Sequence, residues 1–513
     1  MQIFDEVTRT SQLYSKIDSL LSFCVRPNYA LSGTDSVFNN VLNKTGTTRN
    51  FTGLKQITVL PVILQQQYNT HHAYGWNDGS MIPAKGYQNQ LSFGLSWKRG
   101  IFSLQARPEI VYTYNSYFSA FPIKHIENIW RDYYHYVVNR IDAPERFGYG
   151  KYLKIFPGQS NFKINYRKLS LGISTENLWW GPGVRNSLVM SNNAPGFPHI
   201  SFNSSQPVTS AIGSFEWQLI GGVLKGSGVI PDDTALLFRG QQLYERKGDG
   251  DRYLNGVVFS WQPKWTKGLF LGFSRVFYQN RSMVEGSFDG YLPVVGKFFK
   301  SQLPAEDAKK RDQLISVFFR LILRKEKAEI YGEFGRNDHS YNTRDFLLEP
   351  EHSRAYIIGF SKTFDGSKRD MQLYGEMTNL QMPSTMFLRA QESWYTHYQI
   401  KHGYTNHGQV IGAGIGPGSS SQTIGLKWIK GVDRIGGSFE RIVRNNDFYN
   451  YAFAPFLAWQ RHWVDYSLNF NRSWRKKNMV FDAQLSCVQS LNYQWYNQSI
   501  VHVNARFGIC YLF

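Results

Sequence analysis

The fold is decided most clearly by the stretch SIVHVNARFGICYLF, residues 499–513. From Val501 onward, apolar residues occupy every odd position, and polar residues such as His502 and Arg506 lie between them. Because the side chains of a β-strand alternate between its two faces, this stretch has one apolar face along its whole length. We therefore predict a long strand at this end of the sequence.

Similar alternation recurs along the chain from about residue 55. Segments 87–98 and 101–114 are separated only by Arg99-Gly100, as in a tight hairpin. The alternating segments are eighteen in number, at 55–68, 87–98, 101–114, 162–167, 169–178, 199–204, 211–224, 253–262, 267–279, 312–324, 327–336, 354–364, 369–379, 421–430, 433–444, 459–472, 477–491 and 499–513. The count is even, and most connections alternate between short and long. This pattern predicts an all-β fold, a transmembrane antiparallel up-and-down β-barrel with short periplasmic turns and long extracellular loops.

The last residue supports the prediction of a barrel, whereas two segments fit the strand count less well. The strand order places Phe513 on the short-turn side, and a terminal aromatic residue there resembles the signal that outer-membrane barrels present to their assembly machinery. Segment 199–204 is short for a barrel strand, and 380–420 has room for another pair of strands.

Composition agrees with a barrel and excludes helical membrane spans. Aromatic residues make up 16% of the chain, with 31 Tyr and 14 Trp, as expected where aromatic girdles lie at two membrane interfaces. No run of about 18 apolar residues occurs, which is the length that a helix needs to cross a bilayer.

The charge of the chain favours anionic partners. The net charge is +19, from 57 Lys and Arg against 38 Asp and Glu. We expect acidic polysaccharide, outer-membrane lipid and lipopolysaccharide as partners. Nucleic acid is not expected, because the cations are scattered and form no basic helix or nucleic-acid motif.

The cysteines and the N-terminal region indicate neither a metal site nor an export signal. Cys24, Cys487 and Cys510 form no C-x-x-C pair, so we expect no metal, no cofactor and no disulfide framework. Residues 1–54 are expected to form a periplasmic segment with a short helix through Leu13 and Ile17, Leu20 and Leu21, which have helical spacing. Residues 55–513 would form the barrel. The first residues lack the basic and apolar regions of a signal peptide, which is expected upstream of Met1 or already removed.

Three connections rich in glycine, aromatic residues and amides are expected to meet at the outer rim: 74–86, 176–199 and 402–420. Aromatic rings stack on the apolar faces of sugars, and amides and guanidinium groups bond to hydroxyls or carboxylates. The predicted glycan-binding residues are Trp76, Asn77, Trp179, Trp180, Arg185, Asn186, Asn192, Asn193, His199 and Tyr404. For Trp179 and Trp180 the alternatives are a place in the interfacial girdle or simple packing.

Glu176 is expected to face the lumen just below this loop. It shares the polar phase of its strand with Ser170 and Ser174. We expect a luminal ion pair between Glu176 and Arg107 or another luminal arginine, rather than direct contact of Glu176 with a ligand.

The sequence does not favour catalysis. The candidates for acid–base or nucleophilic chemistry are His71-His72, His402 with His407, and Asp338 with His339. None lies in a motif with a known mechanism, and the G-x-S-x-G, H-E-x-x-H and P-loop patterns are absent from the sequence. We therefore expect no catalytic residues.

The central motif resembles the capsule-assembly Wzi family in its Bacteroidota-type form. The resemblance rests on ENLWWGPG (176–183), RNSL (185–188) and SNNAPGFPH (191–199), and further on YGWNDG (74–79), PAKG (83–86), RPE (107–109), FEW (215–217) and 402–418. It implies an eighteen-stranded outer-membrane barrel with a lectin-like role, holding capsular polysaccharide or exopolysaccharide at the cell surface. It also implies a small N-terminal helical element that closes the inner end of the barrel.

Three functions follow as hypotheses. The first is a non-enzymatic outer-membrane protein that binds polysaccharide for capsule assembly. The second is a solute channel, and the third an accessory subunit of a larger secretion or surface-assembly complex that holds a protein partner. The sequence leaves open whether the lumen is plugged.

Overall fold

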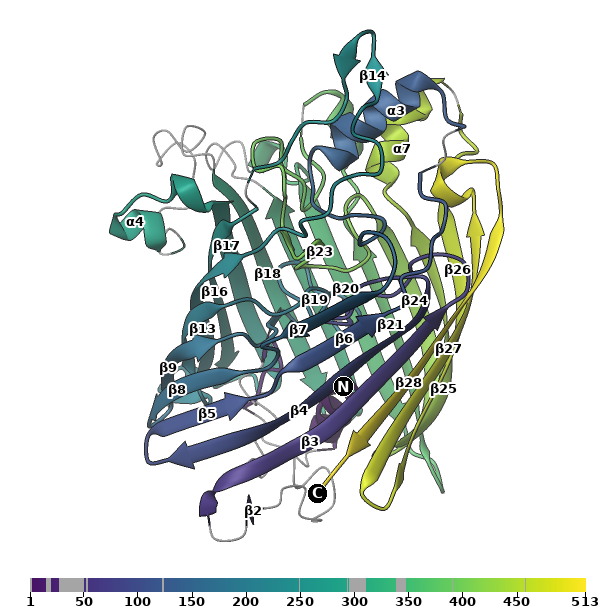
Figure 1. Cartoon of the computed structure of the whole chain (residues 1–513). Helices are drawn as coiled ribbons and strands as arrows, with labels where there is room; N and C mark the ends of the chain where they lie inside the picture. The colour runs from purple at the N-terminus through teal and green to yellow at the C-terminus, as the bar shows by residue number, and fades with distance from the viewer. Residues whose placement is uncertain are drawn as a thin grey trace.

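The computed structural model describes residues 2–14, 20–26, 50–51, 54–121, 124–248, 250–292, 294, 311–337, 347–389, 391–456 and 458–513. Over these residues, eighteen antiparallel barrel strands form a closed ring (Figure 1). The ring closes where the last strand, β28 (Ile500–Tyr511), pairs with the first long strand, β3 (Leu54–Asn69). The predicted class and strand number are confirmed.

The barrel strands agree closely with the predicted segments. After β3 they are β4 (Gly86–Arg99), β5 (Phe102–Ala106), β6 (Glu109–Thr113), β7 (Tyr152–Phe156), β8 (Asn161–Tyr166), β9 (Leu169–Ser174), β11 (His199–Ser204), β12 (Val208–Ser210), β13 (Gly213–Leu224), β16 (Arg252–Pro263), β17 (Leu269–Asn280), β18 (Arg311–Leu323), β19 (Ala328–Asn337), β20 (Arg354–Phe364), β21 (Asp370–Asn379), β24 (Ser420–Lys430), β25 (Asp433–Val443), β26 (Val464–Lys476), β27 (Met479–Leu491) and β28. The short β2 (Asn50–Phe51) pairs with the start of β3, which β28 does not reach.

Three barrel strands are interrupted. One of the interruptions explains why the predicted fourth segment, 162–167, begins too far along the chain. β5 and β6 are separated by Arg107 and Pro108, because proline has no N–H for the ladder. On the next strand, β8 pairs with β5 and β7 pairs with β6. The fourth strand therefore begins at Tyr152 rather than near residue 162. β11 and β12 together form the sixth strand, and both pair with β13.

Apolar side chains cover the outside of the barrel and polar ones face inward. Large exposed apolar residues alternate along single strands, as Leu171 and Ile173 do on β9, while Ser170 and Ser174 on the same strand are buried. This is the pattern of a strand between lipid and an interior. None of the described helices is long and apolar enough to cross a membrane.

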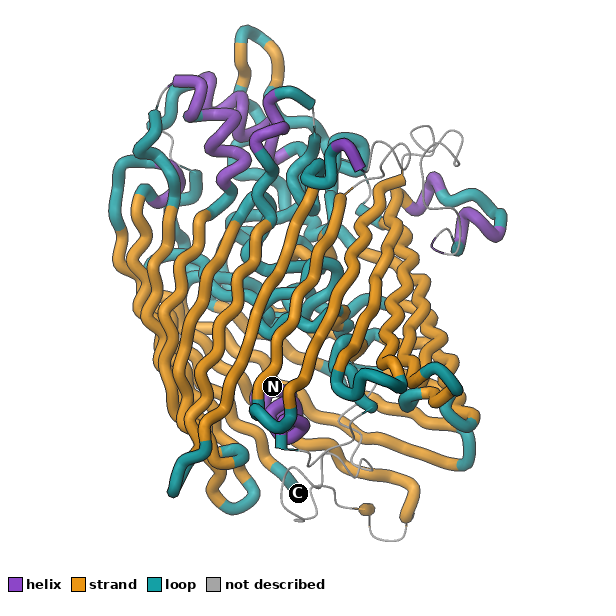
Figure 2. Tube along the Cα trace, turned by 180° about the vertical axis from the view of Figure 1, so that it is seen from behind, coloured by secondary structure: helices purple, strands orange, loops and turns teal. Residues whose placement is uncertain are grey.

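The N-terminal helix lies inside the barrel, near the end that carries the short turns (Figure 2). Helix α1 spans Gln2–Leu13, so it ends where the predicted helix was expected to begin. Of the other residues of that prediction, Leu20 and Leu21 lie beyond the helix and Ile17 lies outside the described residues. The face of α1 that contacts the barrel wall carries Glu6 and Arg9, which pair with charged wall residues. A search of the sequence for an apolar stripe therefore misses this helix.

Short elements occupy the other end and the interior. They are α3 (Glu127–Tyr133), η1 (Tyr134–Val138), β14 (Leu237–Phe238), β15 (Gln241–Gln242), η2 (Arg281–Met283), α4 (Phe288–Tyr291), η5 (Ser384–Phe387), α7 (Asn446–Ala452), η6 (Ala454–Phe456), η7 (Tyr493–Trp495), β1 (Val25–Arg26), β10 (Trp179–Trp180), β22 (Thr405–Asn406) and β23 (Gln409–Val410). We call the end with α3 and α7 the outer end and the short-turn end the inner end (Figure 1). The described residues of the stretch 380–420 contribute no barrel strand before Ser420; within them, β22 pairs only with β23.

The lumen contains a packed apolar core. The connections 175–198 and 380–419 contribute Trp180, Leu188, Trp394 and Tyr395 to one buried cluster, together with inward-facing wall residues such as Val258. β10 of the first connection pairs with β1 of the N-terminal segment. We call residues 175–198 the plug loop. Long connections that leave the strands at the outer end therefore fold back into the barrel.

Gly359 tests how tightly the inner wall is packed. It lies opposite Tyr331 in the β19–β20 ladder, and a Cβ atom at residue 359 would meet the buried Tyr331 ring. We predict that Gly359→Ala lowers the free energy of unfolding by about 1–3 kcal/mol, the usual effect of overpacking. Urea unfolding in lipid vesicles measures this change.

Gly248→Ala is the matched control, because a Cβ atom at residue 248 would meet no other described residue within 4 Å. Equal stabilities of the two variants would contradict close packing at Gly359.

Candidate functional site

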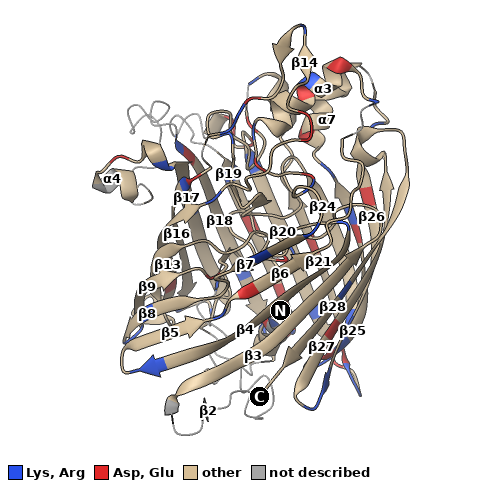
Figure 3. Cartoon of the chain, in the orientation of Figure 1, with Lys and Arg blue, Asp and Glu red and all other residues tan. Residues whose placement is uncertain are grey.

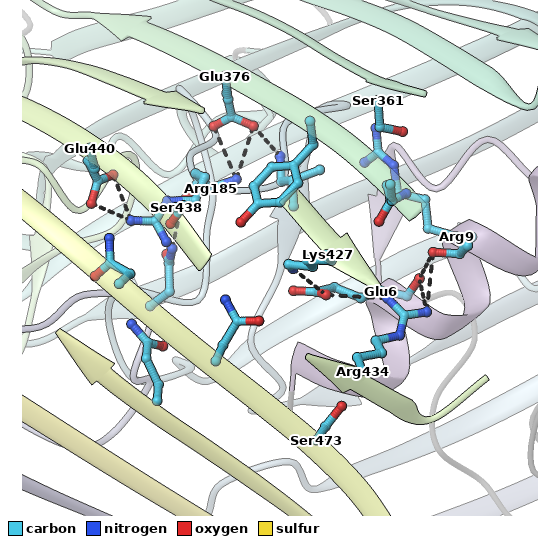
Figure 4. A pocket seen from close by; sticks show the side chains of 18 of the residues that line it. Glu6, Arg9, Arg185, Ser361, Glu376, Lys427, Arg434, Ser438, Glu440 and Ser473 are labelled. Atoms are coloured by element: carbon cyan, nitrogen blue, oxygen red, sulfur yellow. Dashed lines mark hydrogen bonds and ion pairs between the residues drawn. The ribbon is translucent and has the colours of Figure 1, made fainter. Parts of the chain in front are cut away.

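The plug loop is held by carboxylates of the barrel wall. Glu376 on β21 accepts backbone hydrogen bonds from Val184 at 2.7 Å, from Arg185 at 3.0 Å and from Asn186 at 2.8 Å. A second wall carboxylate, Glu440 on β25, receives the Arg185 guanidinium at 2.6 Å. These contacts join one loop to strands far away in sequence (Figure 4).

Trp180 is the deepest aromatic residue of the plug loop. Its side chain is 0% exposed, and its indole N–H donates to Gln218 Oε1 on β13 at 2.9 Å. Trp179 is 4% exposed and lies under the Arg26 guanidinium, 4.6 Å from the ring centroid. Both residues therefore pack inside the barrel, where neither can stack on a sugar outside it.

The expectation that the predicted glycan residues stand at the outer rim is corrected. Their connections turn inward, because wall carboxylates and apolar wall residues offer them partners there. The buried members of the set are Trp179, Trp180, Asn186, Asn193, His199 and Tyr404. The half-buried members are Trp76, Asn77, Arg185 and Asn192.

Several of these residues bind one another and so build the plug. Asn77 Nδ2 donates to the Arg185 carbonyl at 2.7 Å, and the backbone N–H of Asn77 donates to Asn193 Oδ1 at 3.2 Å. The Arg185 guanidinium lies 5.4 Å from the centroid of the Trp76 ring. The structure brings these residues together inside the barrel rather than at its outer rim.

The predicted ion pair between Glu176 and Arg107 is also corrected. Glu176 is buried as expected, but its partner is Lys163 on the neighbouring strand β8, at 2.8 Å. Arg107 lies at the break between β5 and β6 and donates to Ser92 Oγ at 3.1 Å and to the Pro61 carbonyl at 3.3 Å. Glu176 thus has an ion pair with Lys163, whereas the Arg107 guanidinium donates to neutral oxygens.

A polar chamber of ≈ 160 Å³ lies between α1, the plug loop and the wall formed by β19 to β21 and β24 to β28 (Figure 4). Glu6 of α1 accepts from Lys427 at 2.8 Å and from Arg434 at 3.4 Å, and Arg9 pairs with Glu329 at 2.8 Å. Burial alone would raise the pKa of Glu6, but Lys427 and Arg434 outweigh it and the pKa is lowered. The charges of this chamber are largely neutralised within the protein.

A larger cavity, of ≈ 860 Å³, opens at the outer end. We call it the outer pocket. Its lining comes from η1, the starts of β18 and β20, the end of β19, the connection 386–399 and α7. Tyr136 and Tyr451 stack on each other with ring centroids 4.1 Å apart, and Tyr398, 56% exposed, lies beside Arg140. The volume is within the range of small-ligand sites.

Three buried polar atoms of the outer pocket have no hydrogen-bond partner among the described residues: Asn337 Oδ1, Gln391 Nε2 and Glu392 Oε2. Asn337 is 4% exposed. Gln391 Oε1 accepts the Ser353 N–H at 2.8 Å, which fixes the amide orientation and leaves the nitrogen available. Glu392 uses its other oxygen for Arg140 at 3.1 Å. Buried polar atoms are normally paired, so these three are open positions in the hydrogen bonding of residues that line the pocket.

The histidines that the sequence singled out have structural surroundings. Burial lowers the pKa of both His402 and His407 to about 4, and Lys154 Nζ lies 3.1 Å from His407 Nδ1. His71 and His72 contact each other at 3.4 Å beside Tyr493. Asp338 and His339 lie outside the described residues. Over the described part of the chain, no group of three or more His, Cys, Asp or Glu could hold a metal ion.

The outer pocket was not predicted, and little in the sequence could have revealed it. Tyr136, Asn337 and Gln391 come from three separate regions that meet only after the barrel has closed. The one usable signal was the length of 380–420, since long connections on a rigid scaffold often carry binding residues.

The closed ring, the apolar outer surface and the polar wall facing inward define a class of protein, the β-barrel of the bacterial outer membrane. The model of the family described as capsule assembly protein Wzi matches residues 64–486. The chain belongs to this family. No curated protein matches it in sequence.

A solved structure shows the same fold. It is described as Wzi, an outer membrane protein involved in group 1 capsule assembly in Escherichia coli and a carbohydrate-binding β-barrel, and has a TM-score of 0.58 at 14% identity. The match covers 88% of this chain and 84% of that one. OccAB2 of Acinetobacter baumannii is a more distant match, with 11% identity, a TM-score of 0.42 and coverage of 88% and 97%.

The hold of Glu376 on the plug loop can be tested by ion conductance. Replacing Glu376 by alanine leaves the N–H groups of Val184, Arg185 and Asn186 without their acceptor. The cost is about 1–3 kcal/mol for a fully buried group such as the Asn186 N–H and less for the two part-buried ones. We predict that the native protein gives little steady conductance in planar bilayers and that Glu376→Ala gives frequent openings. Glu376→Gln, which keeps one oxygen acceptor, should have a smaller effect.

The control is Glu127→Ala, which removes an exposed carboxylate from α3 at the outer end. If Glu376→Ala conducted no more than this control, the carboxylate would not be what keeps the plug loop in place.

Proposed function

We propose that this protein binds polysaccharide at the cell surface and retains it there for capsule assembly. The observation that carries the proposal is the outer pocket. It has aromatic walls, and three of its lining residues each have a buried polar atom without a hydrogen-bond partner among the described residues. Family membership and the carbohydrate-binding description of the Escherichia coli structure support it.

The chemistry of the outer pocket suits a hydroxyl-bearing sugar. A hydroxyl group both donates and accepts, so sugar hydroxyls can satisfy Asn337 Oδ1 and Glu392 Oε2 as donors and Gln391 Nε2 as acceptors. The stacked pair of Tyr136 and Tyr451, together with Tyr398, gives the pocket an aromatic wall for the apolar side of the sugar. The free carboxylate oxygen of Glu392 would repel a carboxylate group of a ligand at this point, so the pocket favours an uncharged sugar residue.

An acidic polysaccharide also contains uncharged sugar residues, and we propose such a polymer as the ligand. Its repeat units would engage the pockets of many copies of this protein on one cell surface. Multivalency of this kind gives firm retention even when each single contact is weak. Trp180 of the plug loop then acts indirectly, by packing in one cluster with Trp394 and Tyr395, which lie next to pocket-lining residues in the sequence.

The packed lumen disfavours a solute channel. Trp180, Trp394 and Tyr404 are all fully buried inside the barrel, where a channel would need water. We propose that the chain is not an enzyme and that the N-terminal segment, residues 1–54, faces the periplasm and closes the barrel from that side. We also propose that the barrel contacts lipopolysaccharide and that it has a protein partner in the envelope.

Gln391→Ala tests the site. The change removes one hydrogen bond to the ligand, and a single bond contributes about 0.5–1.5 kcal/mol. We predict that the dissociation constant for polysaccharide fragments rises about 3- to 10-fold, measured by isothermal titration calorimetry on the purified barrel.

Gln460→Ala is the matched control, because Gln460 is an exposed glutamine outside the pocket lining. Binding that is equally affected in both variants would remove the outer pocket from the proposal. A native protein that binds no capsular or exopolysaccharide would remove the function itself.

A further inference from the structure

The positive charge of the chain is concentrated at the inner end of the barrel. Every described short turn between barrel strands carries or adjoins Lys or Arg, except the turn at 211–212. Figure 3 shows several of these cations in blue at the inner end. The exposed members, which we call the turn cations, are Lys98, Arg99, Arg167, Lys264, Lys267, Lys325, Lys368, Arg369, Lys430, Lys476 and Lys477.

The carboxylates of these same turns are already engaged. Glu326 receives Lys362 at 3.2 Å, and Asp365 pairs with Lys327. Asp370 accepts the Tyr14 hydroxyl at 2.5 Å, and Asp433 accepts the backbone N–H of Arg475 at 3.3 Å. Among the described residues, none of the turn cations has a carboxylate partner within ion-pair distance. The inner rim is therefore a ring of uncompensated positive charge.

The apolar outer surface of the barrel continues to within a few residues of this ring. Exposed apolar or aromatic side chains near the turns are Phe102, Tyr166, Leu169, Trp265, Leu323, Phe364, Trp428 and Met479. Trp265 is 70% exposed and lies between Lys264 and Lys267 in one turn. A strand rises about 3.3 Å per residue, so a cation one to three residues beyond the last apolar side chain lies about 3–10 Å from the hydrocarbon edge. This is the depth of the lipid headgroups.

We propose that the turn cations bind the phosphate groups of anionic phospholipids around the whole inner rim of the barrel. A protein partner would meet a patch on one side, whereas a lipid annulus meets every turn, and the turn cations are spread over the circumference. Lys and Arg keep their apolar stems against the hydrocarbon while their charges reach the headgroups. Trp265 is the matching interfacial aromatic residue.

The test compares lipid selectivity in nanodiscs. The full chain is placed in nanodiscs of phosphatidylethanolamine with and without phosphatidylglycerol, and the retained lipids are measured by native mass spectrometry. We expect the native protein to retain phosphatidylglycerol over phosphatidylethanolamine by about 5-fold or more and to unfold at a higher temperature when phosphatidylglycerol is present. High salt should reduce the preference, because screening shortens the reach of each charge.

A variant with Lys264→Gln, Lys267→Gln, Lys368→Gln and Arg369→Gln should lose at least half of that preference. The matched control replaces four exposed cations of the outer end, Lys124, Lys151, Arg239 and Arg246, by glutamine and should keep it. If the first variant does not assemble, Lys98→Gln, Arg99→Gln, Lys476→Gln and Lys477→Gln test the same ring at two other turns.

Equal retention of the two phospholipids by the native protein would overturn the proposal. So would an equal loss in the outer-end control, or a thermal shift with inorganic phosphate in phosphatidylethanolamine discs as large as that with phosphatidylglycerol, which would indicate a free-phosphate site. A turn variant with unchanged lipid selectivity that instead loses binding to polyglutamate would identify an acidic macromolecule as the partner.

Discussion

The interior of this barrel depends on the backbone hydrogen bonds that Glu376 accepts from residues 184–186. A loop that crosses a lumen carries N–H groups away from bulk water, and each needs an acceptor. Wall carboxylates supply those acceptors, and Glu440 adds a charge partner for Arg185. With the loop fixed, Trp180 and Leu188 can pack against the wall and against Trp394 and Tyr395. The packed cluster inside the lumen and the contacts of the plug loop with residues 380–419 therefore rest on a loop that wall carboxylates hold in place.

The two ends of the barrel perform different physical tasks. The outer end places aromatic rings and three unpartnered polar atoms around one cavity, which is a local and directional arrangement. The inner end distributes unpaired cations around a ring beside apolar side chains, which is a diffuse and non-directional one. A barrel that holds a long polymer at one rim experiences a lateral pull, and broad contacts with the bilayer at the other rim resist tilting.

The barrel wall could be predicted from the sequence because the membrane imposes a simple rule on it. Residues such as Leu171 and Ile173 must face lipid, so their alternation is visible without a structure. No comparable rule applies to the interior. Glu376 and Glu440 occupy the polar positions of their alternating strands in the same way whether the lumen around them holds water or a loop, so the pattern cannot distinguish the two. Trp179 and Trp180 were correctly placed in a shaped loop, but aromatic residues suit a sugar surface and a packed core equally well. The outer pocket joins Asn337, Gln391 and Tyr136, whose proximity depends on ring closure and on no local pattern.

The ladder between β1 and β10 constrains the order in which the chain can be assembled. It joins Val25 to Trp180 inside a ring that only β28, near the end of the sequence, completes. The plug loop enters from the outer end and the N-terminal segment from the inner end, so this ladder forms only after both segments have entered the lumen. Contacts between such distant residues form slowly. Filling of the lumen is therefore a folding step of its own, distinct from the pairing of neighbouring wall strands.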